Sequence, residues 1–279
     1  MSILHAGSHR LSLARPLVMG IVNVTPDSFS DGGRLGDAQA AIRHALKLQE
    51  AGADILDVGG ESTRPGAAPV PADEEIRRVL PVIGALAGYG CVVSVDTMKP
   101  DVMRAALASG AAMVNDVMAL RVPGALEAVA ATGAAVCLMH MQGEPQRMQQ
   151  APRYADVVEE VKQFLQARAA ACEAAGIGRE RLVIDPGFGF GKTLEHNLSL
   201  LKHLDRLAGL GLPVLAGLSR KSMLGTLTGR SVDKREFAGI AAHLAALARG
   251  ARLVRVHNVA AMRDALAVWN AVEEQQDGT

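Results

Sequence analysis

The fold is decided by residues 17–24, which read LVMGIVNV and continue into the polar turn TPD at residues 25–27. A run that is apolar at nearly every position predicts a strand buried on both faces, as in a parallel sheet. A stretch with helical periodicity follows at residues 37–51. This part of the chain therefore predicts a buried strand that leads through a polar turn into a covering helix.

The same strand–helix pattern occurs eight times along the chain. The apolar runs lie at residues 17–24, 53–58, 91–95, 113–117, 135–139, 181–184, 213–218 and 253–256. Helical periodicity lies at residues 37–51, 72–86, from 99 onward, 155–175, 194–207, on both sides of Gly229, and at 260–273. Eight such units in 279 residues, with no linker between them, favour a single (β/α)₈ TIM barrel domain over residues 1–279.

The alternative architecture is an open, doubly wound parallel sheet. That fold usually places a glycine-rich dinucleotide turn after its first strand. Residues 23–27 read NVTPD instead. The first turn therefore favours the closed barrel.

Composition restricts the class of protein. Hydrophobic residues make up 49% and charged residues 21% of the chain, and the formal net charge is +0. A nucleic-acid-coating protein usually shows a basic surplus, so we expect no nucleic-acid partner. No apolar run approaches the length of a membrane span, and the dispersed Cys91, Cys137 and Cys172 suggest buried free thiols. We therefore expect a cytoplasmic protein with no membrane segment.

Each predicted strand ends in polar residues, and the eight carboxyl ends of a barrel share one rim, where barrel enzymes carry their active sites. Cations at this rim are Arg64, Lys221 and Arg255, accompanied by His257. Phosphate often binds near the loops after strands seven and eight of such barrels, and three of these four residues lie there. The rim therefore predicts an anion site, against the alternative of surface cations that bind nothing.

A second polar group consists of Asp96, Asn115 and Asp185, which follow strands three, four and six. Carboxylates and an amide in a narrow cavity suit a flat heterocycle with N–H donors and a carbonyl. The alternative for each aspartate is a helix cap or a loop brace. We expect Asp57 and Asp116 to support the structure or the residues that contact the ligand.

Three phenylalanines, Phe29, Phe188 and Phe190, lie in loops at strand ends, where each either anchors its loop or offers a face to a flat substrate. Residues 187–192 contain three glycines, but Pro186 and Lys192 break the nucleotide-loop spacings. These glycines are more typical of a backbone that passes close to a ligand. His140 is interpreted as a support for its loop.

These residues together resemble the dihydropteroate synthase family of pterin-binding barrels over about residues 16–272. The resemblance rests on MGIVNVTPDSFSDGG at 19–33, residues 57–66 with their STRPG, SVDT at 94–97, ND at 115–116, DPGFGFGK at 185–192, SRKS at 219–222 and RVH at 255–257. Two positions depart from the family pattern: Asn258 stands where aspartate is usual, and no serine follows Gly239.

The resemblance implies a reaction in which 4-aminobenzoate displaces diphosphate from 6-hydroxymethyl-7,8-dihydropterin diphosphate to give 7,8-dihydropteroate. It implies that Asn23 helps to hold Mg²⁺ on the diphosphate. It assigns the diphosphate to Thr63, Arg255 and His257, with Arg64 nearby, and the pterin to Asp96, Asn115, Asp185 and Lys221, with Met139 packing on the ring. It assigns 4-aminobenzoate, and the sulfonamides that compete with it, to Phe190, Lys221, Ser222, Phe29, Thr63, Arg64 and Pro65. A homodimer is also implied.

The chemistry suggests a largely dissociative, SN1-like displacement. Mg²⁺ and cations would stabilise the departing diphosphate, and Asp185 or Asp96 would stabilise the pterin cation. An aromatic amine is neutral at pH 7, so no strong base is needed. We expect the loops at 25–36 and 61–71 to close over the substrates.

Three other functions are compatible with parts of the pattern. A pterin-binding methyltransferase barrel shares the fold and the pocket, but it has little need for Arg64, Arg255 and His257 together. A catalytically silent relative that acts as a binding protein is a second alternative. A Schiff-base aldolase built on Lys221 is a third.

Overall fold

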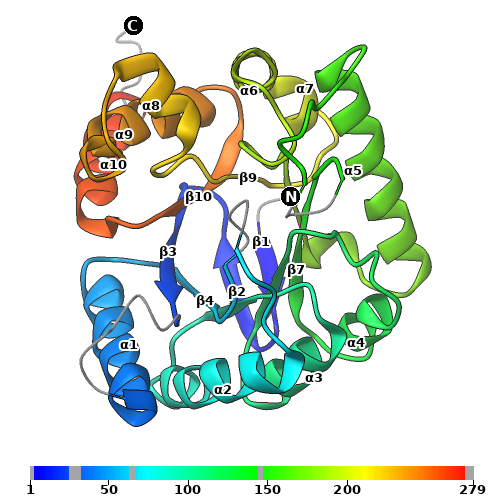
Figure 1. Ribbon diagram of the computed structural model, residues 1–279, viewed down its shortest axis with the longest axis vertical. Coiled ribbons are helices and arrows are strands. Elements are labelled where there is room, and N and C mark those ends of the chain that lie inside the picture. Colours follow the sequence, from blue (N-terminus) through cyan, green and yellow to red (C-terminus); the bar gives the residue numbers. More distant parts are fainter. Residues whose placement is uncertain (1–2, 25–32, 63–66, 144–146, 274–279) are drawn as a thin grey trace, which may run out of the picture.

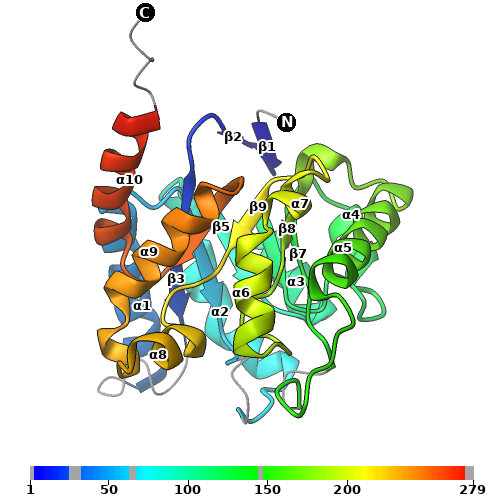
Figure 2. The same cartoon turned by 90° about the horizontal axis from the view of Figure 1, so that it is seen from above.

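The computed structural model describes residues 3–24, 33–62, 67–143 and 147–273. Eight parallel strands form a closed barrel in the order β10-β3-β4-β5-β6-β7-β8-β9 (Figures 1 and 2). Their bounds are β3 Leu17–Asn23, β4 Ile55–Gly59, β5 Val93–Asp96, β6 Met113–Asp116, β7 Ala135–Met139, β8 Leu182–Asp185, β9 Val214–Ala216 and β10 Ala251–Val256. The predicted TIM barrel is confirmed, and each strand lies within a few residues of its predicted run.

Helices surround the barrel as an outer layer (Figure 1). They are α1 Gly33–Glu50, α2 Ala72–Gly88, α3 Pro100–Ala108, α4 Ala125–Ala130, α5 Val157–Ala174, α6 Leu194–Lys202, α7 Asp205–Ala208, α8 Ser222–Thr228, α9 Glu236–Leu247 and α10 Val259–Glu273, with short 3-10 turns η2 at Arg179–Arg181 and η3 at Val232–Lys234. The six-residue α4 was not predicted, because it is too short to show helical periodicity. The helix predicted at 194–207 is two helices, α6 and α7.

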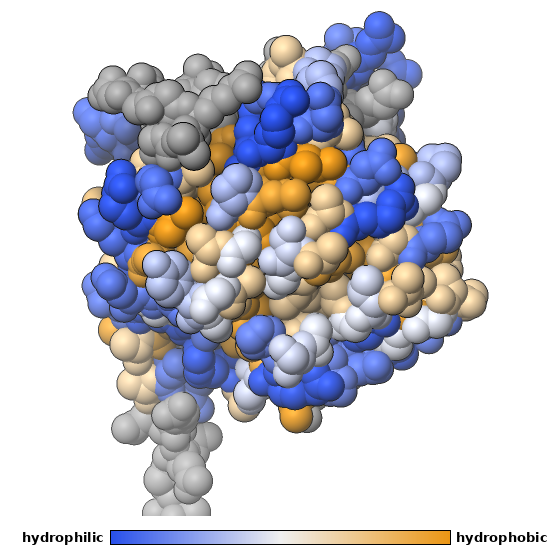
Figure 3. Space-filling model, turned by 90° about the horizontal axis from the view of Figure 1, so that it is seen from below, coloured by the Kyte–Doolittle hydropathy of each residue, from blue (hydrophilic) through white to orange (hydrophobic). Residues whose placement is uncertain are grey.

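The apolar core lies mainly between the strands and the helices. Strand residues such as Val18, Val22 and Leu56 are almost fully buried there, in one cluster with helix residues such as Val82 and Ile83 of α2. The helices bury one side: α2, for example, buries Val79, Val82 and Ile83. Figure 3 views the side where α1, α2 and α3 lie at the bottom of Figure 1, and it shows an apolar area in the middle of that face with hydrophilic groups around it. The amphipathic helices thus explain the alternating pattern of the sequence.

A hairpin that the sequence analysis did not predict precedes the barrel. Its strands, β1 Ile3–Ala6 and β2 His9–Ser12, pair antiparallel. Leu4 and Ala6 are 1% and 0% exposed, and they pack on residues inside the barrel, including Met113. Figure 2 shows the hairpin at the end of the barrel opposite α8. It therefore closes the amino-terminal end of the barrel and leaves the carboxyl-terminal rim for ligands.

The cysteines and the helices agree with two expectations from the sequence. Cys91, Cys137 and Cys172 are all buried and unpaired. None of the helices in the described part of the chain is long and apolar enough to span a bilayer.

Candidate active site

Strand register brings the predicted polar residues side by side at the carboxyl-terminal rim. Asn23 at the end of β3 is level with Gly59 of β4, and Gly59 is level with Asp96 of β5. Asp96 is in turn level with Asn115 of β6. Asn23, Asp96 and Asn115 therefore lie level at this rim, and Asp185 lies two residues further along β8 than the residue level with Asn115.

Arg255 of β10 connects two carboxylates of this region. Its Nε donates to Oδ2 of Asp57 over 2.6 Å, and its Nη2 donates to Oδ2 of Asp96 over 2.7 Å. We predicted Arg255 as part of an anion site and Asp96 as part of a separate pocket for a heterocycle. In the structure the two groups are continuous, because one guanidinium bridges carboxylates from two different strands.

Asp57 is fully buried and contacts two of the predicted site residues directly. Besides Arg255, its Oδ2 accepts a hydrogen bond from Nδ2 of Asn115 over 3.0 Å. This bond fixes the orientation of the amide and leaves the carbonyl oxygen of Asn115 as an acceptor for a ligand. The supporting role expected for Asp57 is therefore a specific one: it orients Arg255 and Asn115 together.

Burial sets the protonation behaviour of the pocket. Burial raises the pKa of Asp96 to about 7, although Arg255 opposes the shift, and the neighbouring Asp57 raises the pKa further. Burial also raises the pKa of Asp185, which the backbone N–H of Gly187, 2.7 Å from Oδ1, partly offsets. Carboxyl groups whose pKa is raised by burial suit the recognition of a ring that carries both hydrogen-bond donors and acceptors.

Beside the carboxylates lies an apolar wall that is rich in thioethers. Met139, Met141 and Met148 are nearly buried, and Phe190 packs against them. Lys221 Nζ lies over the Phe190 ring, 4.2 Å from its centroid, and Ser222 begins α8 directly after Lys221. A flat surface with an adjacent cation suits a planar, electron-rich or anionic aromatic molecule.

Phe188 and His257 are placed by contacts within the protein. Phe188 is 1% exposed and belongs to the core between strands and helices, so it anchors its loop and offers no face to a ligand. Nδ1 of His257 shares a hydrogen bond with the Ser219 hydroxyl over 2.9 Å. That bond ties the turn after β10 to the turn after β9.

Four predicted site residues, Phe29, Thr63, Arg64 and Pro65, lie outside the described residues, as do parts of the predicted closing loops at 25–36 and 61–71. The base of the second loop is described. Lys99 Nζ pairs with Oε2 of Glu61 over 2.7 Å and with the buried Glu75. Sequence reasoning missed this brace, because its three members belong to separate elements.

Two other polar residues serve the backbone of their own loops. Asp116 accepts hydrogen bonds from the N–H groups of Met118 and Leu120 over 2.8 and 2.7 Å, which confirms the supporting role expected for it. Asn258 accepts from the N–H of Ala261 at the start of α10 over 3.1 Å. Asparagine and aspartate cap helices equally well, so this departure from the family pattern leaves the local structure intact.

Sequence reasoning also missed Lys192, which it used only to exclude a nucleotide loop. Lys192 is 3% exposed, and its ammonium donates to Nδ1 of His140 over 3.0 Å. Burial, and then Lys192, lowers the pKa of His140 to about 3, so the imidazole is a neutral acceptor. His140 thus supports its loop, as predicted, through a partner that the sequence did not suggest.

Asn23 is the one predicted metal ligand. Within the described residues no group of three or more His, Cys, Asp or Glu side chains could hold a metal ion. Mg²⁺ prefers oxygen and often takes only one or two protein ligands when substrate phosphates supply the others. The amide oxygen of Asn23, half-buried at the end of β3, fits that donor set.

Comparison with known proteins agrees with this geometry. A family model described as pterin binding enzyme matches residues 19–257. Dihydropteroate synthase of Neisseria meningitidis serogroup C is 53% identical over 272 residues, which cover 96% of each chain.

Solved structures of such enzymes match over nearly the whole chain. The Xanthomonas albilineans dihydropteroate synthase with 4-aminobenzoic acid has a TM-score of 0.93 at 57% identity and covers 99% of both chains. The Burkholderia cenocepacia enzyme complexed with 7,8-dihydropteroate has a TM-score of 0.89 at 50% identity, covering 98% of this chain and 96% of that one. This chain therefore belongs to the pterin-binding enzymes and, among them, to the dihydropteroate synthase family of transferases.

Proposed function

We propose that this protein condenses 6-hydroxymethyl-7,8-dihydropterin diphosphate with 4-aminobenzoate to give 7,8-dihydropteroate and diphosphate, a step of tetrahydrofolate biosynthesis. The observation that carries the proposal is the pocket in which Arg255 joins Asp96 and Asp57 beside Asn115. A pterin presents N–H donors and a carbonyl on one flat ring, and this set of carboxylates and an amide matches them.

In this proposal Asp96, Asn115 and Asp185 hold the pterin edge. The two carboxylates accept from its N–H groups, and the carbonyl oxygen of Asn115, left available by Asp57, accepts another. Lys221 donates to the ring, and Met139 packs on its face. The methyltransferase alternative would use the same pocket, but it has no diphosphate to neutralise.

The diphosphate is proposed to bind at the turns after β10 and β3. Arg255 and His257 supply N–H donors, and Thr63 and Arg64 are assigned to this anion by the family resemblance. Asn23 would hold Mg²⁺, which when bound supplies positive charge to the leaving group. No group of three or more metal-ligating side chains is found in the described chain, and this suits a metal whose other ligands come from substrate.

We propose that the carbon–oxygen bond breaks before the amine attacks. Asp96 and Asp185 lie in the pocket that holds the ring, where a carboxylate stabilises the cation that forms on the pterin methylene. Phe190, Lys221 and Ser222, with Phe29, Thr63, Arg64 and Pro65, are proposed to hold 4-aminobenzoate, and sulfonamides are proposed to compete there. The amine attacks as the neutral base, so no protein base is assigned to it.

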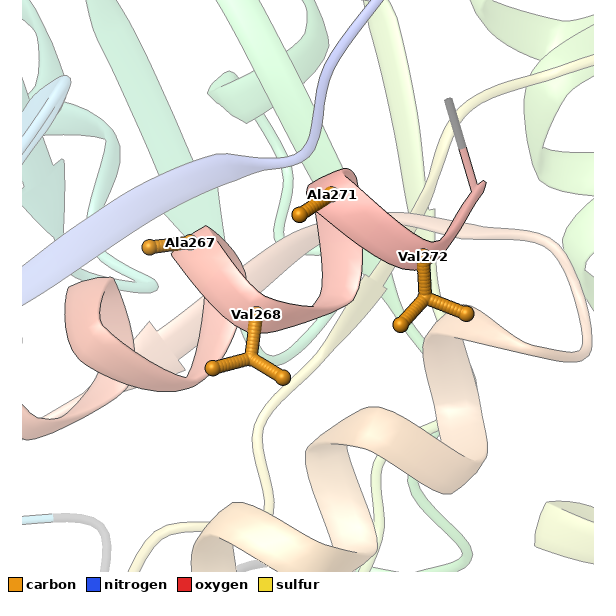
Figure 4. Close-up of a pocket in the computed structure, with 4 residues that line it drawn as sticks. All are labelled: Ala267, Val268, Ala271 and Val272. Carbon is orange, nitrogen blue, oxygen red and sulfur yellow. The ribbon is translucent and has the colours of Figure 1, made fainter. Parts of the chain in front are cut away.

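We also propose a cytoplasmic homodimer. Large apolar side chains are exposed on one side of the molecule: Leu227, Val232, Phe237, Val268 and Val272 are 53%, 49%, 83%, 67% and 64% exposed. They lie on α8, η3, α9 and α10, which are neighbours in both cartoon views (Figures 1 and 2). Figure 4 shows Ala267, Val268, Ala271 and Val272 along successive turns of α10, where they line a surface hollow. Burial of these side chains against a second copy would remove apolar surface from water.

The reaction is tested by incubating the purified protein with the pterin diphosphate, 4-aminobenzoate and Mg²⁺ and measuring both products. We expect equal amounts of dihydropteroate and diphosphate, and a loss of about 100-fold or more in rate when a chelator removes the metal. Excess Mg²⁺ should restore the rate. Diphosphate release without dihydropteroate, or full activity in the presence of chelator, would contradict the reaction or its metal requirement.

The order of bond breaking is tested with ¹⁸O in the oxygen that bridges the pterin methylene and the diphosphate. If ionisation comes first, we expect the label to move into non-bridging positions of unreacted substrate when 4-aminobenzoate is withheld. A label that stays in place, together with rates that follow the nucleophilicity of substituted anilines, would indicate direct displacement.

Asp57→Asn tests the pocket. The change leaves Arg255 without one of its two counterions, and an asparagine N–H facing Asn115 cannot accept the existing hydrogen bond. We expect kcat/KM for the pterin diphosphate to fall by about 30- to 150-fold, which corresponds to a loss of about 2–3 kcal/mol of transition-state stabilisation. Asp101→Asn, on the exposed face of α3, is the control and should change kcat/KM less than about twofold. A near-normal kcat/KM for folded Asp57→Asn would remove Asp57 from the site.

Phe237→Glu tests the dimer. A charge at this position should be expelled from an apolar interface, so we expect sedimentation velocity to show dimers for the natural chain and monomers for the variant. Tyr89→Glu, exposed at the end of α2, is the control and should remain dimeric. Sedimentation of the natural chain as a monomer at micromolar concentration would contradict the proposed dimer. The proposed cytoplasmic location is tested separately, by cell fractionation.

A further inference from the structure

Lys192 is a buried cation that the proposed reaction does not use. It follows the glycine turn at residues 187–191, after β8, and only 3% of it is exposed. Its Nζ donates to the backbone oxygens of Phe190, Gly187 and His140 over 2.9, 3.0 and 3.2 Å, and to Nδ1 of His140 over 3.0 Å. Four acceptors from two separate loops therefore converge on one nitrogen.

The contacts of Lys192 favour its charged form. An ammonium has three N–H donors, whereas a neutral amine has only two, and three carbonyls and an imidazole nitrogen surround this group. No described carboxylate lies within ion-pair distance of Nζ. Burial lowers the pKa of Lys192 to about 7, and Asp185 opposes the shift from a longer distance. Backbone dipoles, and not a carboxylate, are thus the nearest partners of the charge.

The loops that Lys192 joins carry groups of both proposed substrate sites. Gly187 donates its N–H to the Asp185 carboxylate over 2.7 Å, and the backbone oxygen of Asp185 accepts from the N–H of His140 over 3.0 Å. The Phe190 ring lies under the ammonium of Lys221. The nitrogen of Lys192 therefore holds two backbone segments next to the Asp185 carboxylate, at Gly187 and His140. It also holds the backbone of Phe190, whose ring forms the aromatic wall.

Glycines allow this approach of the two loops. Gly187 has a φ of +68°, and a Cβ there would collide with the backbone oxygen of His140. Gly191 has a φ of +61°, and a Cβ there would lie 2.7 Å from the backbone oxygen of Gln142. The glycines that resemble a nucleotide loop thus serve contact between two backbones, and Lys192 binds the carbonyls at that contact.

We propose that Lys192 is a positioning residue of the active site, and that its ammonium fixes the turn at residues 187–191 so that the Phe190 ring is held in place for 4-aminobenzoate. The proposal rests on the proposed function. Lys192 does not touch either substrate: it acts through Phe190, whose carbonyl it binds and whose ring forms the wall.

The experiment is a double-mutant cycle with Lys192→Met and Phe190→Ala. Methionine keeps the length and apolar stem of lysine and removes the donors. Steady-state kinetics are measured for the natural chain, both single variants and the double variant, at a temperature where each is folded by circular dichroism. Lys202→Met is the matched control, because Lys202 is exposed at the end of α6.

We expect Lys192→Met to raise KM for 4-aminobenzoate by about tenfold to 100-fold, as a misplaced substrate wall does. The same change in the Phe190→Ala background should raise it less than about twofold, because the ring that Lys192 positions is absent. Lys202→Met should leave both kcat and the KM for 4-aminobenzoate unchanged. A lower melting temperature for Lys192→Met accompanies this result but does not by itself support the proposal.

Two outcomes would overturn the proposal. One is a folded Lys192→Met variant with unchanged KM for 4-aminobenzoate. The other is a KM increase of the same size in both backgrounds, which would mean that Lys192 acts without Phe190. If the methionine variant does not fold, Lys192→Gln, which keeps two N–H donors, is judged by the same two criteria. Absence of product from the natural chain would instead refute the proposed function, so the two failures are distinguishable.

Discussion

The ion pairs of Arg255 with Asp57 and Asp96 are the interaction on which the pocket depends. They join β10 to β4 and β5 across the carboxyl-terminal end of the barrel, at distances of 2.6 and 2.7 Å. Buried carboxylates that lack a counterion are strongly destabilising, and here one guanidinium serves two. The same contacts orient Asn115 through Asp57, so the charge balance of the pocket and its hydrogen-bonding pattern have one origin.

Another cation, Lys192 in the turn after β8, organises a different part of the rim in a different way. Arg255 is held by carboxylates and is rigidly charged, whereas Lys192 is held by carbonyls and by the neutral His140. A planar guanidinium suits two directed contacts, while a compact ammonium suits converging backbone oxygens. Some of the side chains proposed to recognise ligands are thereby positioned by strands, and others by a turn.

The sequence predicted the barrel well because its strands are short apolar runs that recur with helices between them. It failed for the β1–β2 hairpin, since four-residue strands gain their stability from packing on the barrel and not from their own pattern. Site residues at strand ends were also predictable, as Asp96 and Asn115 show. The pairings of Asp57 and Lys192 were not, because their partners come from distant segments that meet only in the folded barrel.

The charges of the described pocket suggest why a metal belongs to the proposed reaction. Asp57, Asp96 and Asp185 lie near Arg255, Lys192 and Lys221, so the described pocket holds three carboxyl groups and three long basic side chains. A pterin ring that arrives neutral leaves this balance unchanged. A diphosphate changes this balance, because it brings several negative charges. Arg255 already pairs with two carboxylates, so it cannot compensate these charges alone. In the proposed reaction, Arg64, His257 and Mg²⁺ held at Asn23 would supply additional positive charge where the leaving group forms.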